Sequence, residues 1–110
     1  MSNPRYRNGH RRREVQAYYR ARRADCYICG RPIDYSLWPP DPWSFVVDET
    51  VAIANGGRVC RANSGPAHRW CNEVKGTHTL EWARAEVKRR LAGGKPAAAS
   101  KPRDFEAADW

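Results

Sequence analysis

The chain of 110 residues carries a formal net charge of +8 and a mean hydropathy of −0.86, so it suits one small domain with a modest core. No apolar run approaches the roughly eighteen residues of a membrane span, and no apolar stretch follows the basic N-terminus as it would in a secretory signal. We therefore expect a cytoplasmic protein without a membrane partner. Its four cysteines should stay reduced, and reduced thiols bind metal rather than form disulfides.

The N-terminal part of the chain is rich in arginine and proline. Residues 1–13 are predicted to form a flexible basic arm, and residues 14–23 a short helix with its apolar side chains on one side. This helix leads into a turn at Cys26, which Gly30 allows to tighten. Four prolines within residues 31–44 predict an extended loop rather than a regular element.

The central elements are predicted to be short. Residues 44–47 are a strand candidate, and residues 51–54 form a second apolar piece before the turn at Gly56 and Gly57. A helical pattern then resumes near Arg69.

The C-terminal part is predicted to contain one amphipathic helix and a disordered tail. The tail covers residues 93–110, where the composition is rich in alanine, proline and charged residues. The apolar positions that share one face of the helix over residues 79–91 are Leu80, Ala83, Val87 and Leu91.

Charge is unevenly distributed along the chain. Residues 1–25 hold eight arginines against two acidic residues, a net of +6, whereas residues 31–59 have a net of −2. A basic chain with one acidic island suits a surface that binds a polyanion around a pocket for a cation. The plainer alternative is that the arginine runs are solvated faces or tails.

Two pairs of potential metal ligands stand far apart in the sequence. Cys26 and Cys29 have two residues between them, and so have His68 and Cys71. Each pair suits a tight turn, and four such donors can close around one tetrahedral zinc ion that stabilises the fold without performing chemistry. Cys60 leaves an alternative, in which four cysteines bind the zinc and His68 is released for another role.

An acidic couple, Asp48 and Glu49, follows the apolar residues of the first predicted strand. The Asp48 carboxylate can bind a hard cation such as Mg²⁺ or Mn²⁺, and Asn72, beside Cys71, can supply a second oxygen. So few protein ligands leave room for water and phosphate oxygens, as phosphoryl chemistry requires. Glu49 is then the adjacent candidate for the general base. Taken alone, the acidic couple is more typical of a solvated turn, and the surrounding motifs are what favour a metal site.

The motifs within residues 26–76 occur in a defined order. They are Cys26-x-x-Cys29, Val47-Asp48-Glu49, Asn55-Gly56-Gly57, Arg61-Ala62-Asn63, Ala67-His68-Arg69-Trp70-Cys71-Asn72 and Lys75-Gly76. In this order and spacing they resemble the HNH endonucleases that are common in bacteriophages of actinobacteria. The part from Arg61 to Gly76 is the most specific.

The resemblance implies an α+β fold of the ββα-metal (His-Me finger) type, stabilised by the zinc and flanked by N- and C-terminal helices. It implies a nuclease domain over residues 14–92. By the same resemblance Asp48 and Asn72 hold the catalytic Mg²⁺ or Mn²⁺, and Asn63 holds the loop and the base in place.

Glu49 departs from the family pattern, because a histidine normally stands there as the general base. A glutamate has an ordinary pKa of about 4.3 and is a weaker base than imidazole. Glu49 is therefore either the general base or a second ligand of the metal ion. In the second case His78 is a candidate for the base. A derivative that no longer cleaves is a further alternative.

The function implied by the resemblance is that of a phage-encoded, metal-dependent endonuclease that hydrolyses phosphodiester bonds of double-stranded DNA in the host cytoplasm. Phage members of the family often act beside the DNA-packaging terminase, which makes the terminase an expected partner of this monomer. The alternative is a DNA-binding accessory protein that holds zinc but does not cleave. The side chains expected on the DNA backbone are Arg11, Arg12, Arg13, Arg20, Arg69 and Lys75.

Overall fold

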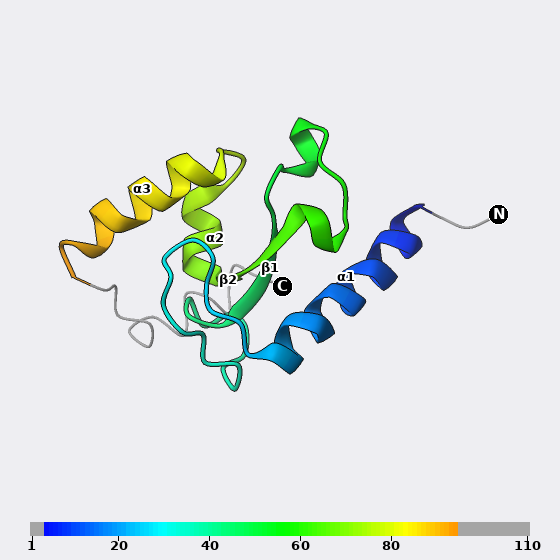
Figure 1. Cartoon of the computed structure of the whole chain (residues 1–110), viewed down its shortest axis with the longest axis horizontal. Coiled ribbons are helices and arrows are strands. Elements are labelled where there is room, and N and C mark those ends of the chain that lie inside the picture. The colour runs from blue at the N-terminus through cyan, green and yellow to red at the C-terminus, as the bar shows by residue number, and fades with distance from the viewer. Residues whose placement is uncertain (1–3, 95–110) are drawn as a thin grey trace.

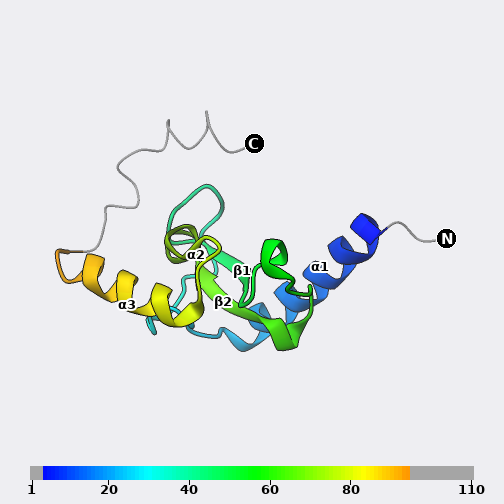
Figure 2. The same cartoon turned by 90° about the horizontal axis from the view of Figure 1, so that it is seen from above.

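The computed structural model describes the backbone of residues 4–94 and the side chains of residues 9–94, and it has an α+β architecture (Figure 1). A two-stranded sheet and a short helix occupy the middle of the molecule. A long helix lies on one side of them and another helix on the other (Figures 1 and 2). The elements are α1 (Pro4–Arg22), β1 (Phe45–Glu49), the 3₁₀ turns η1 (Ile53–Asn55) and η2 (Arg61–Asn63), β2 (Ser64–His68), α2 (Arg69–Lys75) and α3 (Leu80–Leu91).

Helix α1 begins ten residues earlier than the sequence predicted. The expected flexible arm over residues 1–13 is therefore helical from Pro4 onward, while residues 1–3 lie outside the described range. A proline at the first helical position is favourable because its missing N–H has no partner there in any case, and arginine is a good helix former. The helix ends at Arg22, and Arg23 adopts a left-handed conformation with φ of 48°.

The sheet contains one strand that the sequence predicted and one that it did not. The strand candidate at residues 44–47 is confirmed as β1, and it extends to Glu49. Residues 51–54 form no strand, since η1 begins within them at Ile53. The antiparallel partner of β1 is β2, with Phe45 opposite His68 and Glu49 opposite Ser64.

Strand β2 was hard to recognise because its sequence is Ser-Gly-Pro-Ala-His, and serine, glycine and proline rarely form strands. Pro66 is tolerated because a two-stranded sheet has only edge strands. Its carbonyl accepts a hydrogen bond from the Tyr27 amide at 2.8 Å, which ties the turn after α1 to the sheet.

The core lies where the sheet, α2 and α3 meet. Ala83 and Val87 of α3 are fully buried there, and Leu80 and Leu91 pack against them, which confirms the predicted apolar face of this helix. Thr79 caps the helix by accepting a hydrogen bond from the Trp82 amide at 3.1 Å. The buried members of the core are Cys26, Ile28, Ile33, Phe45, Ala67, Cys71, Ala83 and Val87.

None of the helices in the described part of the chain is long and apolar enough to cross a membrane. Of the predicted tail, residues 95–110 lie outside the described residues.

Candidate functional site

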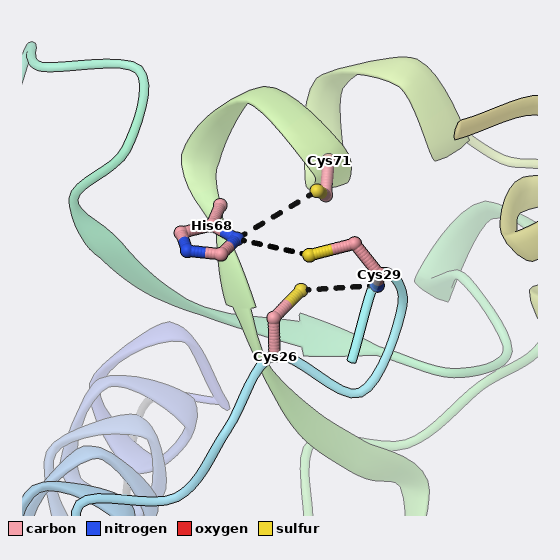
Figure 3. Close-up of side chains that lie close together, drawn as sticks. All are labelled: Cys26, Cys29, His68 and Cys71. Atoms are coloured by element: carbon pink, nitrogen blue, oxygen red, sulfur yellow. Dashed lines mark hydrogen bonds between the residues drawn. The ribbon is translucent and has the colours of Figure 1, made fainter. Parts of the chain in front are cut away.

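Three cysteines and one histidine converge at the junction of the turn after α1, β2 and α2 (Figure 3). Cys26 and Cys29 lie on a tight turn, closed by a hydrogen bond from the Gly30 amide to the Cys26 carbonyl at 2.8 Å. His68 ends β2, and Cys71 lies in the first turn of α2. The four potential ligand atoms all lie within 4.8 Å of one another, so the two predicted pairs form one cluster.

The His68 ring is held in the orientation that a ligand needs. Its Nδ1 faces the sulfurs, at 3.4 Å from Cys29 Sγ and 3.8 Å from Cys71 Sγ. Its Nε2 lies 3.1 Å from the Pro32 carbonyl oxygen, to which it donates when it carries the proton. This outer hydrogen bond leaves the lone pair on Nδ1, inside the cluster, as is usual for metal-bound histidine.

The three thiols and the imidazole lie close enough to share protons, and these contacts shift the pKa values of Cys26, His68 and Cys71. Hydrogen bonds from Cys29 and Cys71 lower the pKa of the Cys26 thiol far below its usual range. The reverse contacts, with Cys26 first and then Cys29, raise the pKa of Cys71. Burial alone would lower the pKa of His68, but its contacts with Cys26 and Cys29 raise it to about 9. A divalent cation would replace these shared protons.

The donor set fits a structural zinc ion. Three thiolates and one imidazole form a common tetrahedral zinc site, and four protein ligands leave no open position for chemistry. Cys26 and Cys71 are almost completely buried. The cluster can therefore hold a zinc ion that joins the turn after α1 to the start of α2.

Cys60 lies outside the cluster. Of the two ligand sets that the sequence left open, the structure brings together the one with His68. Cys60 is partly buried beside α1, where it lines a cleft with Arg11 and Arg61.

Asp48 is buried and held by two partners. Its carboxylate accepts a hydrogen bond from the Tyr27 hydroxyl and lies 3.2 Å and 3.4 Å, through its two oxygens, from the Lys75 ammonium. Burial raises the pKa of Asp48, and the contacts with Tyr27 and Lys75 oppose that rise. Asp48 is thus part of a buried ion pair.

Lys75 differs from its predicted role. The side chain is fully buried, and its ammonium also donates to the Glu49 carbonyl at 3.0 Å. An ammonium enclosed in this way does not face a DNA phosphate, so the expected backbone contact at this position is replaced by an internal one.

Tyr27 is a residue that sequence reasoning missed. Its ring covers Gly65 so closely that a Cβ on that glycine would lie 2.2 Å from it, and its hydroxyl also lies 3.2 Å from Thr50 Oγ1. Burial, and then the contact with Asp48, raise the pKa of Tyr27 above its usual range. The available signal was Gly65 itself, because a glycine within a strand often marks a close approach.

Glu49 lies half-buried at the end of β1. Burial raises the pKa of its carboxyl group, Arg12 lowers it, Asp48 raises it and Lys75 lowers it, with a net rise. Helix α1 contacts β1, so the arginine-rich helix lies beside the strand that carries the acidic couple.

Asn63 clamps the loop that follows β1. Its Nδ2 donates to the carbonyls of Val51 at 3.0 Å and Arg58 at 2.9 Å, and its Oδ1 accepts from the Val51 amide at 2.9 Å. Gly57 lies inside this clamp, where a Cβ would come within 1.7 Å of the Val51 carbonyl oxygen. The asparagine holds the loop, which agrees with the positional part of its expected role.

Asn72 and His78 lie at either end of the segment that carries Lys75. Asn72 stands three residues before Lys75 on α2, and residues at this spacing share a helix face. His78 stacks on Trp82, with ring centroids 3.8 Å apart, and its Nδ1 lies 3.1 Å from the Lys75 carbonyl oxygen. It also lines a small pocket of about 230 Å³ with Thr50, one residue beyond Glu49.

The predicted DNA-contacting arginines fall into two groups. Arg20 donates to the Tyr35 carbonyl at 3.2 Å and lies over the Phe45 ring, while the partly buried Arg69 lies 3.4 Å from Glu73. These two arginines therefore make contacts within the fold. The other group consists of Arg11, Arg12 and Arg13, which are exposed on α1.

Within the described residues, the Cys/His cluster is the only group of three or more histidine, cysteine, aspartate or glutamate side chains placed to hold a metal ion. Asp48 and Asn72 would form a sparser site of a different kind. A scan of known protein-family models, a search of curated proteins and a search of solved structures found no match to this chain. What the structure defines is a small α+β domain with a buried Cys₃His cluster suited to zinc.

Proposed function

We propose that this protein is a metal-dependent DNA endonuclease. The observation that carries the proposal is the position of the acidic couple at the end of β1. Asp48 and Glu49 lie beside α1, whose exposed arginines suit a polyanion, and Arg12 is close enough to lower the pKa of Glu49. A DNA backbone bound to α1 would pass next to the only acidic pair on the sheet within the described residues.

The order of elements supports the same proposal. Two antiparallel strands are followed directly by α2, which is the order that the resemblance to HNH endonucleases implies. Asp48 lies on β1 and Asn72 on the face of α2 that also carries Lys75, the partner of Asp48. The two expected ligands of a catalytic ion therefore lie on adjoining elements.

Each residue would then have a distinct task. Asp48 and Asn72 would hold Mg²⁺ or Mn²⁺, which supplies charge stabilisation at the phosphate and the leaving oxygen. Glu49, whose pKa is raised by burial, would accept the proton of the attacking water. Asn63 would keep the loop after β1 in place, and the arginines of α1 would hold the backbone.

A second function is favoured by one specific contact. Lys75 already neutralises Asp48 from a fully buried position, so a cation at Asp48 must share or displace that ammonium. A protein in which Lys75 keeps this position would bind DNA through α1 without cleaving it. This second candidate is a DNA-binding accessory protein stabilised by zinc. The terminase as a partner in either case rests on the family resemblance alone.

A plasmid-nicking assay tests the proposal. Zinc-loaded protein is incubated with supercoiled DNA, with Mg²⁺ or Mn²⁺ added or omitted, and relaxed product is measured. We expect nicking only with the added ion, and its loss in Asn72→Ala. Asn72 is the better first variant than Asp48, because replacing Asp48 also breaks a buried ion pair.

The base is tested by replacing Glu49. Glu49→Gln should lose most of the rate while Glu49→His retains activity, because imidazole titrates near neutral pH. Zinc content and circular dichroism confirm that each variant is folded. A wild type that binds DNA but does not nick it when Mg²⁺ or Mn²⁺ is added would exclude the endonuclease and leave the accessory protein.

A further inference from the structure

A cleft of about 730 Å³ lies between α1 and the η2 turn, on the same side of the sheet as α1. We propose that this cleft, here named the α1–η2 cleft, binds the DNA backbone next to the acidic couple, with Arg61 as its principal phosphate contact. This inference rests on the DNA-binding part of the proposed function and adds a residue and a path for the strand. The residues that line the cleft are Arg11, Glu14, Val15, Tyr18, Cys60, Arg61 and Ala62.

Arg61 is exposed but held in a defined place. Its guanidinium lies 4.2 Å from the centroid of the Tyr18 ring, a distance that suits a cation–π contact. Arg22 lies over the same ring at 3.6 Å, so two guanidinium groups gather around one tyrosine of α1. A guanidinium over an aromatic ring keeps its N–H donors at its edge, so the exposed Arg61 can still bind a phosphate.

The two walls of the cleft are fixed to each other. Ser64 Oγ donates to the Arg61 carbonyl at 2.8 Å, and the Tyr19 hydroxyl lies 3.1 Å from the same Ser64 oxygen. Val15 is buried at the inner side of α1. Because these contacts join α1 to the start of β2, the arginines on both walls keep their spacing when DNA is absent, which lowers the entropic cost of binding.

The charge of the cleft favours a polyanion. Arg11 and Arg61 lie on opposite walls, and Glu14 is the only acidic residue among those that line it. The Glu14 carboxylate lies 3.7 Å from His10 Nε2 on the same helix. Two guanidinium groups that line one cleft can bind neighbouring phosphates of a DNA backbone.

The cleft also leads to the acidic couple. Ser64, which is bonded to Arg61, stands opposite Glu49 in the sheet register. On the other wall, Arg12 follows Arg11 and acts on the charge of Glu49. A backbone held between Arg11 and Arg61 is therefore led past Glu49 by residues of both walls.

Cys60 provides a built-in reporter for this cleft. It is the one cysteine of the four that lies outside the metal cluster, and it is free and partly buried within the cleft. Zinc protects the other three thiols from alkylation, so iodoacetamide should label Cys60 selectively in the zinc-loaded protein. A strand bound in the cleft should slow that labelling.

The experiment compares Arg61→Gln with Arg90→Gln. Arg90 is an exposed arginine of α3, which Figures 1 and 2 place on the opposite side of the sheet from α1, so its replacement removes the same charge at a distant site. Duplex DNA affinity is measured at several salt concentrations without Mg²⁺ or Mn²⁺. Alkylation of Cys60 is followed by peptide mass spectrometry, with and without saturating DNA.

We expect Arg61→Gln to weaken affinity by about three- to tenfold near 0.1 M salt and to reduce the salt slope by about 1, as loss of one phosphate contact does. Arg11→Gln should act in the same direction, and Arg90→Gln should leave the slope unchanged. DNA should slow Cys60 alkylation severalfold. Equal salt slopes for the two main variants, or an alkylation rate of Cys60 that saturating DNA does not change, would overturn the inference.

The test of the cleft is independent of the nicking assay, because DNA affinity and Cys60 alkylation are both measured without Mg²⁺ or Mn²⁺. If the protein nicks DNA but Arg61→Gln binds DNA as tightly as the wild type, the cleft proposal is refuted and the endonuclease proposal stands. If Arg61→Gln weakens DNA binding but the wild type never nicks DNA, the cleft proposal stands and the endonuclease proposal is refuted.

Discussion

Breaking the buried ion pair between Asp48 and Lys75 from one side should strongly destabilise this small domain. The Lys75 ammonium is fully buried, lies 3.2 Å from one Asp48 oxygen and donates to the Glu49 carbonyl. Asp48→Asn leaves that ammonium facing a neutral amide. Removing one partner of a buried pair costs about 3–5 kcal/mol, because the remaining charge is neither solvated nor compensated. A domain of ordinary stability has only about 5–15 kcal/mol in total.

A double-mutant cycle separates the pair from its surroundings. Asp48→Asn, Lys75→Met and the combined variant are unfolded with urea at a fixed zinc concentration, since bound zinc also stabilises the native state. Removing both charges leaves no buried ion, so the combined variant should be more stable than the sum of the single losses by about 1–3 kcal/mol. Glu86→Gln is the control, because it breaks exposed pairs with Arg89 and Arg90 and should cost far less.

The pH dependence gives the cycle a second measurement. Lys75 lowers the pKa of Asp48 against the larger effect of burial, so Lys75→Met should raise that pKa further. An acid with a raised folded-state pKa adds stability below its unfolded-state pKa, and this stability is lost as pH rises through the folded-state value. The loss caused by Lys75→Met should therefore be smaller at pH 5 than at pH 8. Strictly additive losses, or an Asp48→Asn loss no larger than that of Glu86→Gln, would refute the reasoning.

Three further predictions follow from the site. Cys60→Ser should keep one zinc per chain by elemental analysis, whereas Cys26→Ser should lose the zinc and unfold because structural zinc binding is coupled to folding; zinc loss in the first variant would contradict the ligand set. Asn63→Ala removes three hydrogen bonds to the loop after β1, and should cost about 1–3 kcal/mol and speed amide exchange in that loop, so unchanged exchange would show that the clamp is dispensable. Burial raises the pKa of Glu49 although Arg12 lowers it, so a carbon-detected NMR titration of Arg12→Gln should find a higher pKa than in the wild type. The stability that this carboxyl adds at low pH should then persist to a higher pH, and an unchanged pKa would separate Arg12 from the acidic couple.

Much of the metal cluster could be predicted from the sequence because its geometry is local. Two ligands separated by two residues reach the same point on a tight turn, whatever the rest of the fold does. Local order did not say which of Cys60 and His68 completes the site. That was decided by β2, which ends at His68 and passes directly into α2 and Cys71.

The amphipathic helix α3 could also be predicted from the sequence, because its apolar positions recur with a period of about 3.6 residues. Strand β2 could not be predicted in this way. Ser64, Gly65 and Pro66 have low strand propensity, and they are extended because β1 pairs with them and Tyr27 packs over Gly65. The extent of α1 was underestimated because a run of arginines is compatible with both a helix and a solvated arm.

The sequence by itself determined which residues are able to do chemistry: the two ligand pairs, the acidic couple and the surrounding arginines. Only the tertiary structure decided how those charges are partnered. Lys75 belongs by sequence to the basic residues that could grip DNA, yet α2 turns it inward onto Asp48, while Arg61 is placed in a cleft with Arg11. The physical reason is that burial and ion pairing depend on which segments pack together, and those contacts join residues that lie tens of positions apart in the chain.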